Sequence, residues 1–171
     1  MIAARLGVVL LAVHALAAAT IVVGQGGDYS SVRDAIAGAA AGDTIRVESG
    51  TYPGSLALDK PLILEGVGKP VIHGDEQGSI ITVLADGCTI RGLILEHSGG
   101  MLVKEDSGIL LHSSGNRIEE NELRDVLFGI YFFASSRNIV TGNVIRGRAW
   151  LGVGERGSGP WIATTTESRR S

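Results

Sequence analysis

Five side chains beyond residue 19 offer the imidazole or sulfur ligands that copper handling would require: His73, Cys88, His97, Met101 and His112. Imidazole nitrogen and sulfur are ligands well suited to copper. None of these residues forms a close His-x-His or Cys-x-x-Cys pair, so the spacing alone is not typical of a metal motif. His97 and Met101 flank a predicted loop, residues 98–106, and are therefore the better candidate pair for copper.

Carboxylates could carry a second kind of chemistry, the cleavage of a polysaccharide. Acidic residues gather in segment 106–125, and glycoside hydrolysis needs two carboxylates about 5 to 9.5 Å apart across a groove. In the sequence repeat described next, the positions equivalent to Glu120 and Glu122 hold Gly142 and Val144, so no column of acidic side chains continues along the chain. We therefore interpret these carboxylates as a solvated acidic face and name no catalytic residue.

A sequence repeat must position these side chains. The pattern Ser113-Ser114-x-Asn116-x-Ile118-x-x-Asn121-x-Leu123 recurs as Ser135-Ser136-x-Asn138-x-Val140-x-x-Asn143-x-Ile145. A period of about 22 residues predicts a solenoid, in which equivalent residues of successive turns stack on one another. Stacked amides bind each other and nearby backbone groups, so we predict a structural ladder rather than a catalytic role for Asn116, Asn121, Asn138 and Asn143.

The repeat extends backwards with a longer spacing. Ile81, Val83, Cys88, Ile90 and Leu95 precede Ile109, Leu111, Asn116, Ile118 and Leu123 by one constant interval. We assign the additional length of this turn to the loop 98–106, because insertions in solenoids are expelled to one face, which is often the binding face. Cys88 then takes a buried wall position and His112 points outward. About four or five turns are predicted in all.

The aromatic residues concentrate in segment 128–133. The spacing of the repeat would place Tyr131 and Phe133 in the inward columns of Ile109 and Leu111, and would turn Phe132 outward. An outward Phe132 could stack on a sugar or on a protein partner. The segment therefore leaves open a simple binding scaffold for carbohydrate or protein.

One helix and several strands are predicted before the repeat. The run that begins at Ser31 resembles a capping box followed by one apolar helical face, and Gly42 is a typical stop. This helix would cover the open edge of the first turn, which would otherwise invite aggregation. Alternating apolar residues in segments 44–48 and 55–59 predict strands with one buried face.

The first 19 residues are typical of a secretory signal peptide. A single charge at Arg5 precedes an apolar run, 6–16, and a small-residue site at Ala17-Ala18-Ala19. A retained membrane anchor is the competing interpretation, because apolar character continues through residue 23. Ile21-Val22-Val23 serve equally well as the first strand of the mature protein, however. After cleavage we expect no membrane span and a periplasmic protein.

Charge and cysteine content exclude some classes of function. Without Arg5 the 15 basic residues become 14, which against 18 acidic residues gives a net charge of −4. This balance argues against nucleic acid as a partner, because nucleic-acid binding normally requires a basic face. The single cysteine cannot form an internal disulfide.

Several short segments of the sequence, in addition to the repeat, resemble those of a known family. Segments 41–52, 58–66 and 70–74 resemble the start of right-handed parallel β-helices. The strings Asp86-Gly87-Cys88-Thr89-Ile90-Arg91-Gly92-Leu93, Asp106-Ser107-Gly108-Ile109, Ile118-Glu119-Glu120-Asn121 and Asp125-Val126-Leu127-Phe128-Gly129-Ile130-Tyr131 are similar to the NosD family of nitrous oxide reductase maturation proteins. The resemblance covers residues 28 to about 148.

The resemblance implies an all-β, right-handed parallel β-helix with an N-terminal amphipathic capping helix. It also implies a non-enzymatic periplasmic protein that works with an ABC transporter in assembling the copper–sulfur centre of nitrous oxide reductase, with the transporter and the reductase as partners. Copper is the only cofactor it suggests. A carbohydrate-active β-helix, either a polysaccharide lyase or hydrolase or a sugar-binding scaffold, is the alternative.

The resemblance also sets the expected boundaries. Family members are longer, and no Asn follows Asn143 in this chain. We therefore expect a signal peptide at 1–19, a β-helix domain at 20–148 that is the N-terminal part of a longer fold, and an irregular tail at 149–171 left by truncation or a frameshift.

Overall fold

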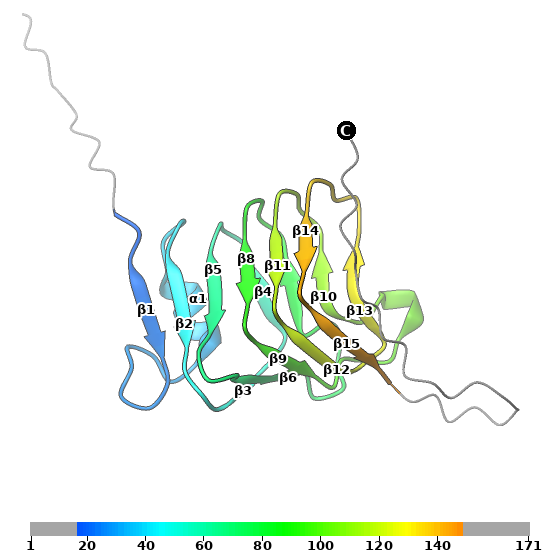
Figure 1. The fold of residues 1–171 in the computed structure, drawn as a ribbon, viewed down its shortest axis with the longest axis horizontal. Helices are drawn as coiled ribbons and strands as arrows, with labels where there is room; N and C mark the ends of the chain where they lie inside the picture. The colour runs from blue at the N-terminus through cyan, green and yellow to red at the C-terminus, as the bar shows by residue number, and fades with distance from the viewer. Residues whose placement is uncertain (1–16, 149–171) are drawn as a thin grey trace, which may run out of the picture.

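The computed structural model describes residues 17–148, which form a parallel β-solenoid of about six turns (Figure 1). The first sheet contains β1 (Thr20–Val23), β2 (Thr44–Val47), β5 (Ile63–Gly66), β8 (Thr89–Arg91), β11 (Arg117–Glu119) and β14 (Ile139–Thr141). The second sheet contains β3 (Thr51–Pro53), β6 (Val71–His73), β9 (Ile94–Glu96), β12 (Glu122–Val126) and β15 (Val144–Gly147). The third sheet contains β4 (Leu56–Leu58), β7 (Ile81–Val83), β10 (Ser107–Leu111) and β13 (Phe128–Phe132).

The predicted parallel β-helix is confirmed, although the predicted number of turns was too low. Turns that carry a strand in every sheet begin at β2, β5, β8 and β11, and a partial turn lies at each end of the described solenoid. The number of residues that separates paired positions in the first sheet changes from turn to turn. It is shortest for the pair Thr44↔Ile63 and longest for the pair Thr89↔Arg117. These unequal lengths hide the early turns from a search for a fixed period.

An apolar column runs through the inside of the first sheet. Ile45, Leu64, Ile90 and Ile118 pair with one another from turn to turn, and each is fully buried. Alternation along each short strand directs these side chains inward and their neighbours toward solvent. Burial of one such side chain contributes about 1.5–3 kcal/mol, so the column stabilises every turn that it crosses.

The N-terminal helix takes the place of a strand in the first turn. Helix α1 (Val32–Gly38) is capped by Ser31, whose hydroxyl accepts a hydrogen bond from the backbone N–H of Asp34 (3.3 Å). Its buried residues, Val32, Ala35 and Ile36, belong to the same core as β4, the first strand of the third sheet. The helix thus covers the edge of that sheet, as predicted, and ends shortly before Gly42.

A loop between β9 and β10 holds the additional residues of its turn. It includes the 3₁₀ helix η1 (Leu102–Lys104) and projects from the solenoid (Figure 1). Its base is fixed, because the N–H of Gly99 donates to the carbonyl of Gly78 (2.8 Å) and the N–H of Met101 donates to the buried carboxylate of Asp106 (2.8 Å). Its tip is apolar and exposed, with Leu102 at 60% and Val103 at 89%.

The predicted orientation of the aromatic residues was wrong by one position. Strand β13 pairs with β10 so that Ile109 lies beside Ile130 and Leu111 beside Phe132, one position earlier than the repeat predicts. Ile130 therefore packs against the core, and the hydroxyl of Tyr131 on the other face donates to Glu105 (2.9 Å). The cause is the direct connection from β12 to β13, which replaces the long loop of the turn before.

Most of the predicted signal peptide (1–19) and the whole predicted tail (149–171) lie outside the described residues. Among residues 17–148, no helix is long and apolar enough to cross a membrane.

The inward column should tolerate truncation poorly. We expect Ile90→Ala to lower the free energy of unfolding by about 2–5 kcal/mol, because the neighbouring turns hold the cavity open. Urea unfolding followed by circular dichroism measures this change. Ile139→Ala is the matched control in the same sheet, since Ile139 is 47% exposed, and it should change the stability by about 0.5 kcal/mol or less. Equal losses in the two variants would contradict the assignment of the core.

Candidate functional site

A group of histidines and carboxylates, here called the histidine cluster, lies where the second sheet turns toward the third. It comprises His73, Glu96 and His97 together with Asp75 and Asp125. The potential ligand atoms of His73, Glu96 and His97 lie within 4.8 Å of one another. The rings of the two histidines are stacked at a tilt, with 4.7 Å between their centroids.

The backbone brings these side chains together. His73 and Glu96 end β6 and β9 and pair with each other, so they share one face of the sheet. His97 follows in the left-handed conformation (φ 61°), and its carbonyl accepts a hydrogen bond from the N–H of Glu76 (3.0 Å). A Cβ atom at Gly74 would lie 2.5 Å from that carbonyl oxygen, so only glycine permits the two turns to approach here.

A carboxylate holds each imidazole. The Nδ1–H of His97 donates to Asp125 (2.8 Å), and the other oxygen of Asp125 accepts a hydrogen bond from Nε of Arg148 (3.2 Å). Nδ1 of His73 lies 2.9 Å from a carboxylate oxygen of Asp75 and 3.1 Å from the backbone N of the same residue. Nδ1 of His73 donates to the carboxylate when it is protonated and accepts from the backbone N–H when it is not. In His97, by contrast, Nδ1 carries the proton that is donated to Asp125, so Nε2 is the unprotonated nitrogen of the neutral ring.

The asparagines form two short ladders at other corners of the solenoid. The Oδ1 atom of Asn138 accepts hydrogen bonds from the N–H (2.9 Å) and the side-chain amide (3.0 Å) of Asn116, and Asn143 binds Asn121 in the same way (3.0 Å each). Each ladder continues to a residue of another type, because Asn116 accepts from the N–H of Cys88 (2.9 Å). Asn121 likewise accepts from the N–H of Leu93 (3.1 Å).

Comparison with curated proteins finds two relatives of one kind. The chain is 31% identical over 113 residues to the "Probable ABC transporter binding protein NosD" of Pseudomonas aeruginosa, a match that covers 65% of this chain and 26% of the relative. It is 28% identical over 126 residues to the protein of the same name from Stutzerimonas stutzeri, covering 72% of this chain and 29% of the relative. This chain is related to the NosD proteins. It spans less than a third of the length of these curated relatives, and no family model or solved structure matches it.

The sulfur-containing candidates of this NosD-like chain lie in different environments. Cys88 is a free, fully buried thiol, and burial raises the pKa of its sulfhydryl, which makes the reactive thiolate scarce. Met101 is 49% exposed in the loop that carries η1. The remaining candidate outside the histidine cluster is His112. It is exposed, and the centroid of its ring lies 5.0 Å from that of Phe133.

Only some of the contacts of His97 could be predicted from the sequence. Asp125 follows His97 by the same number of residues as Leu123 follows Leu95, its partner in the neighbouring turn. The contact between His97 and Asp125 could therefore have been predicted from the repeat. His73 lies on the preceding turn, at the end of β6, where it pairs with Glu96, the residue before His97. No fixed period predicts that pair.

An acidic side chain that could have served hydrolysis is bound to arginines. Glu122 accepts hydrogen bonds from Arg124 (2.9 Å) and from Arg146. The hydrogen bond from Arg124 is the largest influence that lowers the pKa of Glu122 below its ordinary value. A carboxylate held ionised in this way is a poor general acid.

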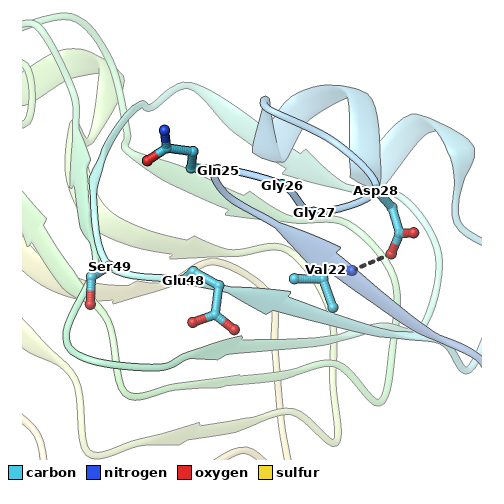
Figure 2. A pocket seen from close by; sticks show the side chains of 7 residues that line it. All are labelled: Val22, Gln25, Gly26, Gly27, Asp28, Glu48 and Ser49. Carbon is cyan, nitrogen blue, oxygen red and sulfur yellow. Dashed lines mark hydrogen bonds between the residues drawn. The ribbon is translucent and has the colours of Figure 1, made fainter.

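A shallow depression lies at the first turn of the NosD-like solenoid. It is lined by Val22, Gln25, Gly26, Gly27, Asp28, Glu48 and Ser49, and Figure 2 shows these residues around the loop that follows β1. The N–H of Val22 donates to the carboxylate of Asp28 (2.8 Å), which fixes that loop. The histidine cluster and the candidates His97 and Met101 do not line it.

The asparagine ladders should contribute to stability. We expect Asn121→Ala to destabilise the solenoid by about 1–3 kcal/mol, because the buried N–H of Leu93 and the carbonyl of Ile90 lose their partner. Thermal unfolding at fixed pH measures the effect. Thr141→Ala, an exposed substitution in β14, should have little effect, and an equally small effect of Asn121→Ala would show that the ladder does not stabilise the fold.

Proposed function

We propose that this chain is a non-enzymatic periplasmic accessory protein that acts with an ABC transporter in assembling the copper–sulfur centre of nitrous oxide reductase. The observation that carries the proposal is its match to two proteins whose name describes binding to an ABC transporter. The match extends over 65% and 72% of the chain. The proposed organisation is a signal peptide at 1–19, a β-helix domain at 20–148 and an irregular tail at 149–171.

The structure of the NosD-like solenoid is compatible with a scaffold that contributes surface. Its core is closed by apolar columns, and several of its acidic side chains are held by arginines. The loop 98–106 offers an exposed apolar tip at Leu102 and Val103, supported by a base that is tied to the neighbouring turn. Exposed apolar side chains on a fixed support are typical of protein contacts.

A sugar-binding scaffold is the second candidate. Phe132 and Phe133 are each 49% exposed, and aromatic faces of this kind stack on sugar rings. Binding of this chain to immobilised polyuronates, lost on Phe132→Ala and Phe133→Ala, would favour this candidate over a transporter partner.

A chimera tests the main proposal. In Pseudomonas aeruginosa NosD, the stretch that matches this chain is replaced by the corresponding residues of this chain. If the proposal holds, cells carrying the chimera in place of their own NosD should consume nitrous oxide, and the reductase purified from them should have its copper absorption bands. An exported, folded chimera that restores neither property would contradict the proposal.

A substitution at the loop tip tests whether this loop contacts the transporter. Val103→Asp in the chimera should abolish co-purification with the transporter, because a charge replaces an apolar contact. Leu84→Asp is the matched control, since Leu84 is 51% exposed outside the loop, and it should leave co-purification intact. Loss in both variants would indicate general damage, and loss in neither would exclude the loop as the contact.

A further inference from the structure

We propose that the histidine cluster is a binding site for a borderline divalent cation of the zinc, cobalt(II) or copper(II) class, with His73, Glu96 and His97 as its ligands. Two imidazoles and one carboxylate are a ligand set that such ions accept, and they are not the thiolate and thioether set that selects copper(I). This inference is independent of the proposed function, because it rests on the contacts of the described residues alone.

The ring nitrogens of both histidines have contacts typical of metal ligands. Histidine ligands in metal sites commonly donate their second ring N–H to a carboxylate, which fixes the ring and makes the other nitrogen more basic. His97 has this contact with Asp125 (2.8 Å), and His73 has it with Asp75 (2.9 Å). Both rings therefore have carboxylates placed to hold Nδ1–H and to leave Nε2 as the ligand atom. For His73, metal binding selects the tautomer that donates to Asp75.

The distances require only side-chain rotation. Ligand atoms about 2.0–2.1 Å from a tetrahedral ion are about 3.4 Å from one another. One potential ligand atom from each of His73, Glu96 and His97, which for the histidines is either Nδ1 or Nε2, lies within 4.8 Å of the other two. The side chains of the two histidines are 34% and 38% exposed. Side chains of this exposure can rotate toward an ion without disturbing the buried columns.

The local charge favours a cation. Glu76 joins His97 and Asp125 in a second group of potential ligands within 4.8 Å, so His97 is shared by two overlapping groups. Four carboxylates lie around the two rings: Asp75, Glu76, Glu96 and Asp125. The nearby arginines are Arg148, which binds Asp125, and Arg124, which pairs with Glu96 in the sheet and is hydrogen-bonded to Glu122. The carboxylates outnumber these arginines, so a divalent ion would lower the local repulsion.

The backbone and the neighbouring loop point to the same corner. His97 and Asp125 are both in the left-handed conformation, at φ 61° and 48°, so the backbone turns in the same way at this corner in two successive turns. The loop 98–106 starts at the residue after His97, and its Gly99 binds Gly78 in the segment that follows His73. Insertions in a solenoid lie on one face, which is often the face that binds ligands.

The site can be tested by metal titration of the full chain freed of metal with a chelator. We expect one Zn²⁺ per chain by isothermal titration calorimetry, and visible absorption bands of a low-symmetry site when Co²⁺ is the probe. His73→Ala and His97→Ala should each weaken binding at least tenfold. Asp125→Asn should weaken it about 10–100-fold while leaving the ligands in place, which is the result expected for a residue that orients His97.

Controls separate this site from the alternatives. His112→Ala removes an exposed histidine outside the cluster and should leave the affinity unchanged. Met101→Leu should also leave it unchanged, and a tenfold loss in that variant would move the site to the loop and overturn the proposal. Circular dichroism confirms that each variant is folded. Absence of Zn²⁺ and Co²⁺ binding by the folded wild-type chain, or equal binding by His73→Ala, would likewise overturn it.

Discussion

The whole molecule depends on parallel pairing between equivalent residues of successive turns. Each strand is very short, too short to be stable alone, and gains its partners from the turns before and after it. The pairing places Ile45, Leu64, Ile90 and Ile118 in one column and so builds the core one turn at a time. A turn whose register slipped by one residue would reverse the faces of its strands.

Helix α1 and the loop 98–106 are two of the departures that this pairing tolerates, for different reasons. The helix lies in the first turn, where β4 has no strand before it, and its buried face replaces the missing neighbour. Lys60 strengthens this end of the helix by donating to the carbonyls of Ile36 (3.0 Å) and Ala39 (3.1 Å). The loop leaves the solenoid at a corner between two sheets, so neither flanking strand loses its register.

The sequence predicted those features that recur from turn to turn. The two matched repeats placed Ile118 over Val140 and Leu123 over Ile145, and the longer spacing of the preceding turn placed the loop before β10. It did not predict the register of β13, because a repeat measured on two sheets says nothing about the third when the connections differ in length. Tyr131 was therefore assigned to the wrong face. The His73–His97 pair was missed for the same reason, since the interval between these histidines occurs in no matched repeat.

Stacking explains both the structural columns and the histidine cluster. At two corners the stacked residues are asparagines, and their amides bind backbone groups of the turn before. At the corner after the second sheet, the stacked residues are His97 and Asp125, and the same closeness produces an imidazole held by a carboxylate. The backbone differs, because His97 and Asp125 are left-handed and the asparagines are not, and the side chains differ in charge and in the ability to ligate a metal. A solenoid can thus acquire a polar site by changing one column, because the inward columns that carry its stability are left untouched.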